Sequence, residues 1–79
     1  MSHDLHDRVV KVVAHTLKVD NDRVSDDARF VEDLGAESMQ SVELIASFEE
    51  EFDIEMDEQA ALGVKTVGHA VEFISTYLG

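Results

Sequence analysis

A chain of 79 residues has room for one small domain, which we place at residues 1–79, and the absence of cysteine excludes disulfides and thiolate metal sites. Eighteen acidic residues against six Lys and Arg give a formal net charge of −12, and every charged residue in the range 30–64 is acidic. Such a chain repels nucleic acid phosphates and anionic lipid headgroups and attracts basic patches on proteins, which argues against nucleic acid binding and membrane insertion.

The first predicted element is an amphipathic helix over residues 4–18. Ser2, or His3 with Asp4, supplies a start suited to capping, and Lys18 lies favourably near the C-terminal end. The N-terminal residues carry acids and lack the apolar run of a signal peptide, and no apolar stretch is long enough to span a membrane, so we expect a cytoplasmic protein. The apolar face of this helix recurs at helical intervals: Leu5, Val9, Val12, Val13, Ala14, Thr16 and Leu17.

A long polar connection follows at residues 19–37. Loops of this length in compact domains are usually functional. Four apolar residues are spaced to fold back onto a core, which predicts an ordered loop: Val24, Phe30, Val31 and Leu34. Gly35 is expected to break the chain just before the next helix.

Three further helical segments complete the predicted fold. The clearest is a helix over residues 38–52, with an apolar stripe of Val42, Ile45, Phe48 and Phe52 and with Leu44 beside it. A short helical turn over residues 57–62 ends at Gly63. Thr66 is expected to cap the last helix, whose buried stripe is Val67, Ala70, Val71, Ile74 and Leu78. Because proline is absent and alternating runs are scarce, we predict an all-α fold, a small four-helix bundle of three main helices and one short one with a long ordered loop between the first and second helices.

The sequence does not predict catalysis or a metal site. A nucleophilic serine needs a base within hydrogen-bond reach, and nothing in the pattern places one of the four histidines beside Ser38. His3 and His6, with neighbouring acids, would bind a divalent ion only loosely at a chain end. The run DNDRVSDD lacks the glycine and the glutamate that a calcium-binding loop requires at fixed positions. We therefore predict that the protein is not an enzyme and holds no resident metal.

Ser38 admits two interpretations from the residues alone. Serine at a helix start most often caps a backbone N–H, although a complete capping box would need Glu or Gln where Ser41 stands. Alternatively, Gly35 lets another protein approach the Ser38 hydroxyl closely and modify it. The residue pattern by itself favours the plain cap.

The context of Ser38 changes this balance. The stretch over residues 24–54, VSDDARFVEDLGAESMQSVELIASFEEEFDI, resembles bacterial acyl carrier proteins of the dissociated fatty acid synthase type. In that family the pattern F-x-E-D-L-G-A-D-S-L-D-S/T-V-E-L precedes E-E-E-F, and the C-terminal TVGHAVEFI is similar to the family's last helix. The matching residues are Phe30, Glu32, Asp33, Leu34, Gly35, Ala36, Ser38, Ser41, Val42, Glu43, Leu44, Glu49, Glu50, Glu51 and Phe52.

The resemblance implies a four-helix bundle whose Ser38 carries 4′-phosphopantetheine, attached from coenzyme A by a phosphopantetheinyl transferase. The thiol of this arm would hold an acyl chain as a thioester, partly sheltered between the helices. The resemblance also implies that a monomer serving fatty acid or related lipid synthesis docks on basic patches of acyl-processing enzymes, namely a ketosynthase, an acyltransferase, a reductase and a dehydratase. The expected recognition residues are Glu37, Met39, Val42, Glu43, Ala46, Glu49 and Glu50.

Four positions near Ser38 depart from the family pattern. Glu37 stands for aspartate, Met39 for leucine, Gln40 for a commonly acidic residue and Ala46 for a bulkier apolar one. These departures leave a specialised carrier as open as a housekeeping one. A peptidyl, aminoacyl or polyketide carrier domain is an alternative. A second alternative is an acidic helical adaptor or cation-binding protein in which Ser38 is only a helix cap.

Overall fold

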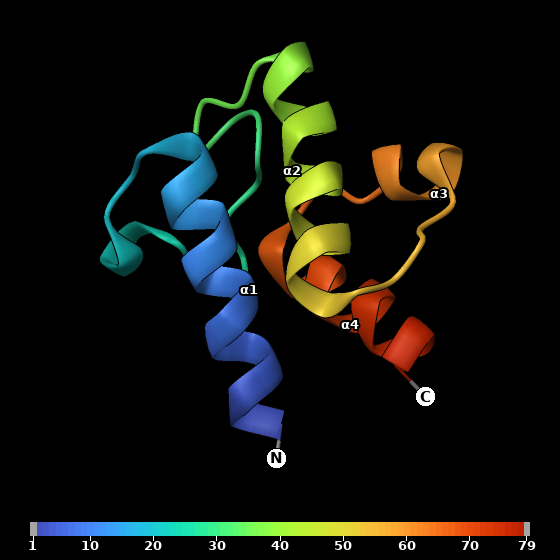
Figure 1. Cartoon of the computed structure of the whole chain (residues 1–79). Helices are drawn as coiled ribbons and strands as arrows, with labels where there is room; N and C mark the ends of the chain where they lie inside the picture. The colour runs from blue at the N-terminus through green and yellow to red at the C-terminus, as the bar shows by residue number, and fades with distance from the viewer. Residues whose placement is uncertain (1, 79) are drawn as a thin grey trace.

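The computed structural model describes residues 2–78, and side chains from Asp4 onward, so the expected capping role of Ser2 or His3 lies outside the described side chains. The described residues form four α-helices: α1 (Ser2–Leu17), α2 (Ser38–Phe52), α3 (Glu58–Leu62) and α4 (Val67–Leu78), together with a 3₁₀ turn, η1 (Asn21–Arg23) (Figure 1). In this part of the chain the only β-type pairing is one isolated bridge between Arg29 and Thr66. The predicted all-α fold, with three main helices and one short one, is therefore confirmed.

The helices pack so that the first residue of α2 lies far from both ends of the chain. α1 and α2 run side by side in opposite directions, and α1 also packs on α4 (Figure 1). The N-terminal end of α2 therefore projects at the end of the bundle opposite the start of α1 and the end of α4. Four side chains at the centre of the core are fully buried: Val9, Val13, Val67 and Ile74.

The buried face of α2 differs from the predicted stripe. Leu44, Phe48 and Phe52 are buried and follow one another at intervals of one helical turn, whereas Val42 is 48% exposed. Placing Val42 in the buried stripe was wrong, because the face that packs against the other helices is centred on Leu44 and turns Val42 outward. Val31 and Leu78, also expected in the core, are exposed. Val31 follows the buried Phe30 in a turn, and Leu78 lies in the last turn of α4.

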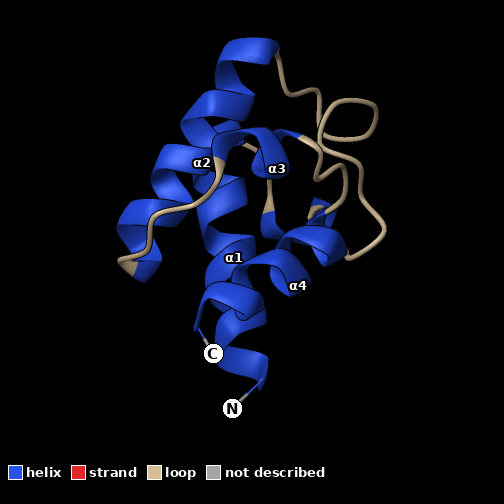
Figure 2. Cartoon of the chain, turned by 90° about the vertical axis from the view of Figure 1, so that its right-hand side faces the viewer, coloured by secondary structure: helices blue, strands red, loops and turns tan. Residues whose placement is uncertain are grey.

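The loop between α1 and α2 is ordered, as predicted, because backbone hydrogen bonds tie it to the start of α4. The N–H of Phe30 donates to the carbonyl of Lys65 at 3.0 Å, and the N–H of Gly68 donates to the carbonyl of Asp26 at 2.9 Å. A Cβ atom at Gly68 would lie only 3.1 Å from that carbonyl oxygen, so glycine allows the close approach. The loop lies to one side of the helices (Figure 2). Its buried residues are Val24, Ala28, Phe30 and Leu34, together with Ala36.

Side-chain caps set the starts of the two C-terminal helices. Thr66 caps α4 as predicted, since its Oγ1 accepts a hydrogen bond from the N–H of His69 at 3.1 Å. Asp57 caps α3 in the same way, accepting from the N–H of Gln59 at 3.0 Å. Gly63 ends α3, as predicted, although its backbone stays in the right-handed region.

Candidate functional site

A closed turn places Ser38 at the exposed start of α2. Gly35 adopts a left-handed φ of 73°, and the N–H of Ala36 donates to the carbonyl of Phe30 at 2.8 Å. Ala36 is buried, whereas Glu37 and Ser38 are exposed. The chain is thus anchored in the core two residues before Ser38 and turns outward there, so the serine hydroxyl is presented on a fixed piece of backbone.

The N-cap of α2 is Glu37, and Ser38 is the first residue of the helix. Glu37 has the extended backbone of a cap residue, and its N–H donates to Oε1 of Gln40 at 2.9 Å. The interpretation of Ser38 as the helix cap is therefore wrong by one residue. Because Glu37 and Gln40 stabilise this helix start, the Ser38 hydroxyl is not needed for that purpose.

Asp33 holds the turn that precedes Ser38, a role that the sequence did not reveal. Its carboxylate accepts hydrogen bonds from the backbone N–H of Arg29 at 2.8 Å and from the Arg29 guanidinium at 3.1 Å. These bonds hold the pKa of Asp33 below its ordinary value. The spacing of four residues between Arg29 and Asp33 was the available signal, but only the folded turn shows that the backbone joins the interaction.

Most of the expected recognition residues share one exposed face of α2. Met39 is 76% exposed, and Glu43, Ala46 and Glu50 are exposed at the i, i+3 and i+4 spacings that bring residues together on a helix. Val42 belongs to this face rather than to the core. Glu37 precedes it directly. The result is a small apolar area bordered by carboxylates and adjoining Ser38.

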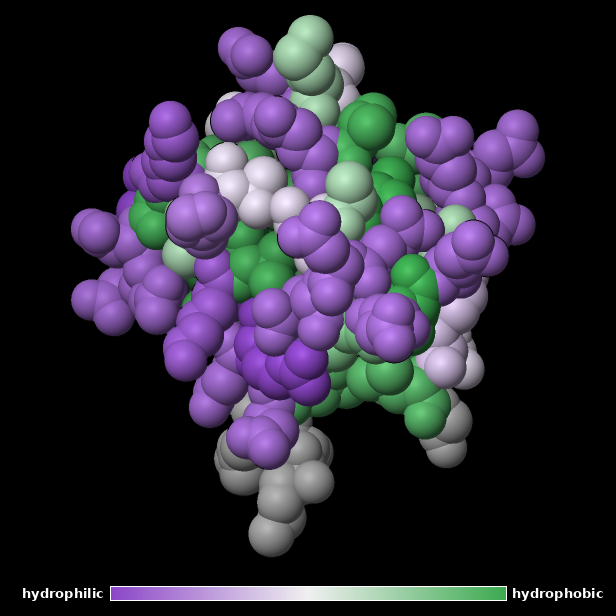
Figure 3. All heavy atoms as spheres, viewed as in Figure 1, coloured by the Kyte–Doolittle hydropathy of each residue, from purple (hydrophilic) through white to green (hydrophobic). Residues whose placement is uncertain are grey.

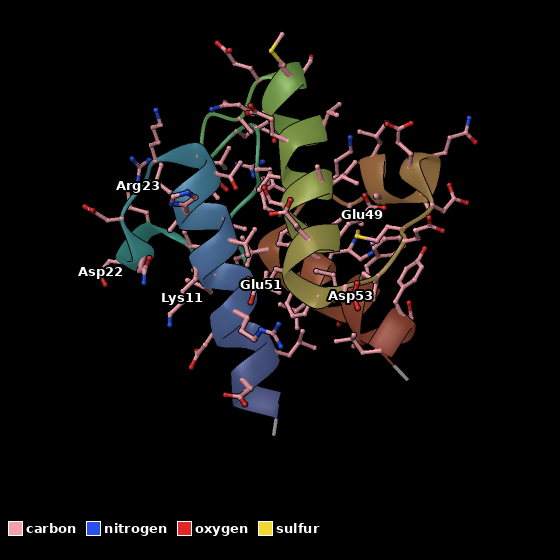
Figure 4. All side chains as sticks on the ribbon, in the orientation of Figure 1. Lys11, Asp22, Arg23, Glu49, Glu51 and Asp53 are labelled. Carbon is pink, nitrogen blue, oxygen red and sulfur yellow. The ribbon has the colours of Figure 1, made fainter. Side chains whose placement is uncertain are left out.

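Glu49 departs from this arrangement. It is half-buried, and its Oε2 accepts a hydrogen bond from the backbone N–H of Met56 at 2.8 Å. Figure 4 shows Glu49 on the side of α2 toward α3, whereas Glu51 lies toward α1. Glu49 is therefore engaged within the fold, unlike the exposed Glu43 and Glu50.

An apolar cavity opens between α2, α3 and α4, one helical turn beyond Ser38. Its volume is about 70 Å³. Ser41 and Leu44 line it from α2, Ala61 from α3, and Phe73 and Ile74 from α4. Figure 3 shows apolar surface between hydrophilic side chains on the face that carries α2 and α3. An apolar group attached near the start of α2 could enter this space.

The histidines lie on α1 and α4, and His15 shares a surface depression with Ser47 rather than with Ser38. His6 pairs with Asp26 of the loop, and His15 and His69 are exposed. The side chains described from Asp4 onward contain no group of three or more potential metal ligands among histidine and acidic residues. His3, the other half of the weak metal pattern, lies outside them. Among the described helices, none is long and apolar enough to cross a membrane.

Two kinds of comparison with known proteins agree. A family model described as the phosphopantetheine attachment site matches residues 7–74, which include the start of α2. The chain is also 49% identical, over 76 residues, to a protein named "Acyl carrier protein" from Phenylobacterium zucineum (strain HLK1). That alignment covers 96% of each chain. Both matches extend across the helices and the ordered loop rather than over a short motif.

Proposed function

This chain belongs to the acyl carrier protein family, and we propose that Ser38 is the residue that bears its 4′-phosphopantetheine arm. Members of the family are carriers rather than enzymes. The proposal is supported above all by the exposed hydroxyl at the first position of α2, a helix whose N-cap is Glu37 and not Ser38. The unpaired N–H groups of a helix N-terminus favour an anionic group such as the phosphodiester of the arm. When bound, the arm supplies the thiol that forms an acyl thioester.

The assignment of Ser38 is tested by modification in vitro. The protein is incubated with coenzyme A, Mg²⁺ and a broad-specificity phosphopantetheinyl transferase, and its intact mass is measured. We expect one arm on the wild type and on Ser41→Ala, whose hydroxyl lies one turn along the same helix, and none on Ser38→Ala. An arm on Ser38→Ala, or none on the wild type, would contradict the assignment.

We further propose that the exposed face of α2 docks on basic patches of partner enzymes. Glu43 and Glu50 border the apolar Met39 and Val42, a combination that suits fast, salt-sensitive and transient association. The partners would be the transferase and acyl-processing enzymes such as a ketosynthase, an acyltransferase, a reductase and a dehydratase. Glu37 and Ala46 complete this surface. Glu49 contributes less to it, because its carboxylate accepts a hydrogen bond from the backbone N–H of Met56.

Reversing one charge tests the docking surface. Glu43→Lys removes an acid from its centre and adds a base, so we expect the KM of the transferase reaction to rise about tenfold while kcat changes little. Asp22→Lys, on η1, makes the same charge change on another side of the molecule and serves as the control. Equal KM values for Glu43→Lys and the wild type would overturn the docking role.

The cargo proposed here is a fatty acyl or related lipid chain. The apolar cavity between α2, α3 and α4 supports this over a peptidyl cargo, as does the relative named "Acyl carrier protein". We also propose that the protein acts as a monomer in the cytoplasm, since a carrier thiol needs a reducing compartment to stay free. The departures at Glu37, Met39, Gln40 and Ala46 all lie on or beside the docking face, which favours a difference in partners rather than in the attachment chemistry.

A further inference from the structure

Two neighbouring backbone groups ahead of α3 are held by side chains from two different helices. The N–H of Met56 donates to Oε2 of Glu49 on α2 at 2.8 Å, and the N–H of Asp57 donates to the hydroxyl oxygen of Tyr77 on α4 at 3.1 Å. Asp57 is also the N-cap of α3. The start of α3 is therefore tied to the rest of the bundle from both sides.

α3 depends on such ties because it is short. Its range is Glu58–Leu62, and a helix of this length is not stable by itself in water. Two of its residues, Ala61 and Leu62, nevertheless line the apolar cavity. The position of α3 therefore sets one wall of the cavity, and the bonds from Glu49 and Tyr77 hold the segment that leads into α3.

The ring of Tyr77, whose hydroxyl holds Asp57, also packs against the α4 wall of the cavity. It meets the ring of Phe73 edge to face, with centroids 5.2 Å apart and an interplanar angle of 67°. Phe73 lines the cavity from α4. Because the ring packs on Phe73 while the hydroxyl holds Asp57, Tyr77 links the α4 wall of the cavity to the segment that carries α3.

The cavity is too small for a long acyl chain as it stands. An engineered apolar cavity of about 150 Å³ takes up one benzene molecule, and the cavity here measures about 70 Å³. A longer acyl chain therefore requires the cavity wall to move. Of the three helices that form this wall, α3 is the shortest and the least stable by itself.

We propose that Glu49 and Tyr77 form a clamp on the start of α3 that limits the length of acyl chain the protein shelters. Both are positioning residues, which act through the segment at Met56 and Asp57. This inference rests on the proposed function for its cargo, but the clamp itself is a property of the protein before Ser38 is modified. It also gives Glu49 a role separate from the docking face.

The clamp is tested first by amide hydrogen exchange on the unmodified protein, with the exchange rates measured by NMR. Tyr77→Phe removes the acceptor and keeps the ring, so we expect exchange at the Asp57 amide to rise about fivefold, the factor for one hydrogen bond of typical net strength. Glu49→Ala should do the same at the Met56 amide, and Glu49→Gln, which keeps an oxygen acceptor, should restore most of the protection. Glu50→Ala is the matched control and should change neither amide.

The consequence for the cargo is tested by loading the arm with butyryl or lauroyl groups and measuring the gain in Tm over the unloaded arm. A butyryl group needs little movement of α3, so wild type and variants should gain equally. A lauroyl group should raise the Tm of Tyr77→Phe and Glu49→Ala more than that of the wild type. In each variant one clamp bond is already absent, so less free energy is spent when α3 moves to admit the chain. Glu49→Gln should behave like the wild type.

The possible failures are distinguishable. Unchanged exchange at both amides in Tyr77→Phe and Glu49→Ala would overturn the clamp, as would an equal rise at the buried Val13 and Ile74, which would show general destabilisation instead. Altered exchange with the same chain-length dependence in every variant would overturn the limit on chain length. If no arm can be attached to Ser38, the proposed function fails and the chain-length limit falls with it, whereas the exchange result still decides the clamp.

Discussion

At the scale of single residues, the site depends on a division of roles between neighbours. Glu37 and Gln40 stabilise the start of α2, Asp33 holds the preceding turn, and Ser38 is left exposed. The departure from the family pattern at Gln40 makes physical sense here, because its side chain retains an oxygen acceptor for the N–H of Glu37 without adding a further charge. A neutral residue at this position therefore preserves the geometry while lowering the negative charge beside the proposed docking face.

The His6 pair is a second residue-scale feature, and it predicts a pH dependence of stability. The ring of His6 donates from Nε2–H to the Asp26 carboxylate, and this hydrogen bond raises the pKa of His6 above its ordinary value of 6.5. A raised pKa in the folded state stabilises the protein at pH values below 6.5, and this contribution is lost as the pH rises through the folded-state pKa. Because the pair is partly exposed, the effect will be modest.

Thermal melts of His6→Gln and the wild type check this expectation. The Tm deficit of the variant should be larger at a pH of about 5.5 than at about 8.5, where the wild-type histidine is neutral. A deficit that is independent of pH, or that grows in alkali, would contradict the assigned role of the pair.

At the scale of elements, α1 holds the C-terminal end of α2 through Arg8. Its guanidinium lies 4.5 Å from the centroid of the Phe52 ring, donates to the Glu51 carboxylate at 2.8 Å and donates to the Glu51 carbonyl at 2.7 Å. That carbonyl lies in the last turn of α2, where a cation is favourable. Arg8 thus makes a cation–π contact with Phe52, an ion pair with Glu51 and a hydrogen bond to the last turn of α2.

Replacing Arg8 should therefore destabilise the fold measurably. We expect Arg8→Ala to lower the free energy of unfolding by about 1–2 kcal/mol, the sum of an exposed cation–π contact and a surface ion pair with a second hydrogen bond. Arg8→Lys keeps the charge but loses the planar stacking, so its loss should be smaller. Urea denaturation measures both variants, with Lys11→Ala as a control that removes one positive charge from the same helix. Equal stability of Arg8→Ala and Lys11→Ala would refute the account of this contact.

Much of the element-scale organisation was predictable from the sequence, for identifiable reasons. The helix over residues 38–52 and the cap at Thr66 follow from local periodicity and short-range capping, which a sequence carries directly. The ordered loop was predictable from its spaced apolar residues, although its hydrogen bonds to the start of α4 were not. The exposure of Val42 and the engagement of Glu49 could not be predicted in this way. Both depend on where α3 and α4 lie relative to α2, and that is a matter of long-range packing.

At the scale of the whole molecule, the dominant feature is charge. A net charge of −12 is carried by a body with a radius of gyration of only 11.2 Å. The body measures 30 × 27 × 18 Å, only two to three Debye lengths of roughly 10 Å at 0.1 M salt, so its acids repel one another across the molecule at low salt. A small domain of this size has roughly 3–5 kcal/mol of stability to set against that repulsion.

Added salt should therefore stabilise the protein. We expect the Tm to rise by several degrees between low salt and about 0.5 M NaCl, because a gain of about 1 kcal/mol shifts Tm by about 4–8 °C in a domain of this size. MgCl₂ at equal ionic strength should have at least the same effect. A melting temperature insensitive to both salts would contradict the role given to self-repulsion.

The central claim is that Ser38 bears the arm, and locating the modification by fragmentation tests it most directly. Trypsin cleavage after Arg29 and Lys65 gives a peptide over residues 30–65, in which the hydroxyl amino acids are Ser38, Ser41 and Ser47. Tandem mass spectrometry of this peptide from the protein's own cells should place 4′-phosphopantetheine, with its cargo, on fragments that contain Ser38. An arm located on Ser41 or Ser47, or a peptide without any arm, would contradict the account.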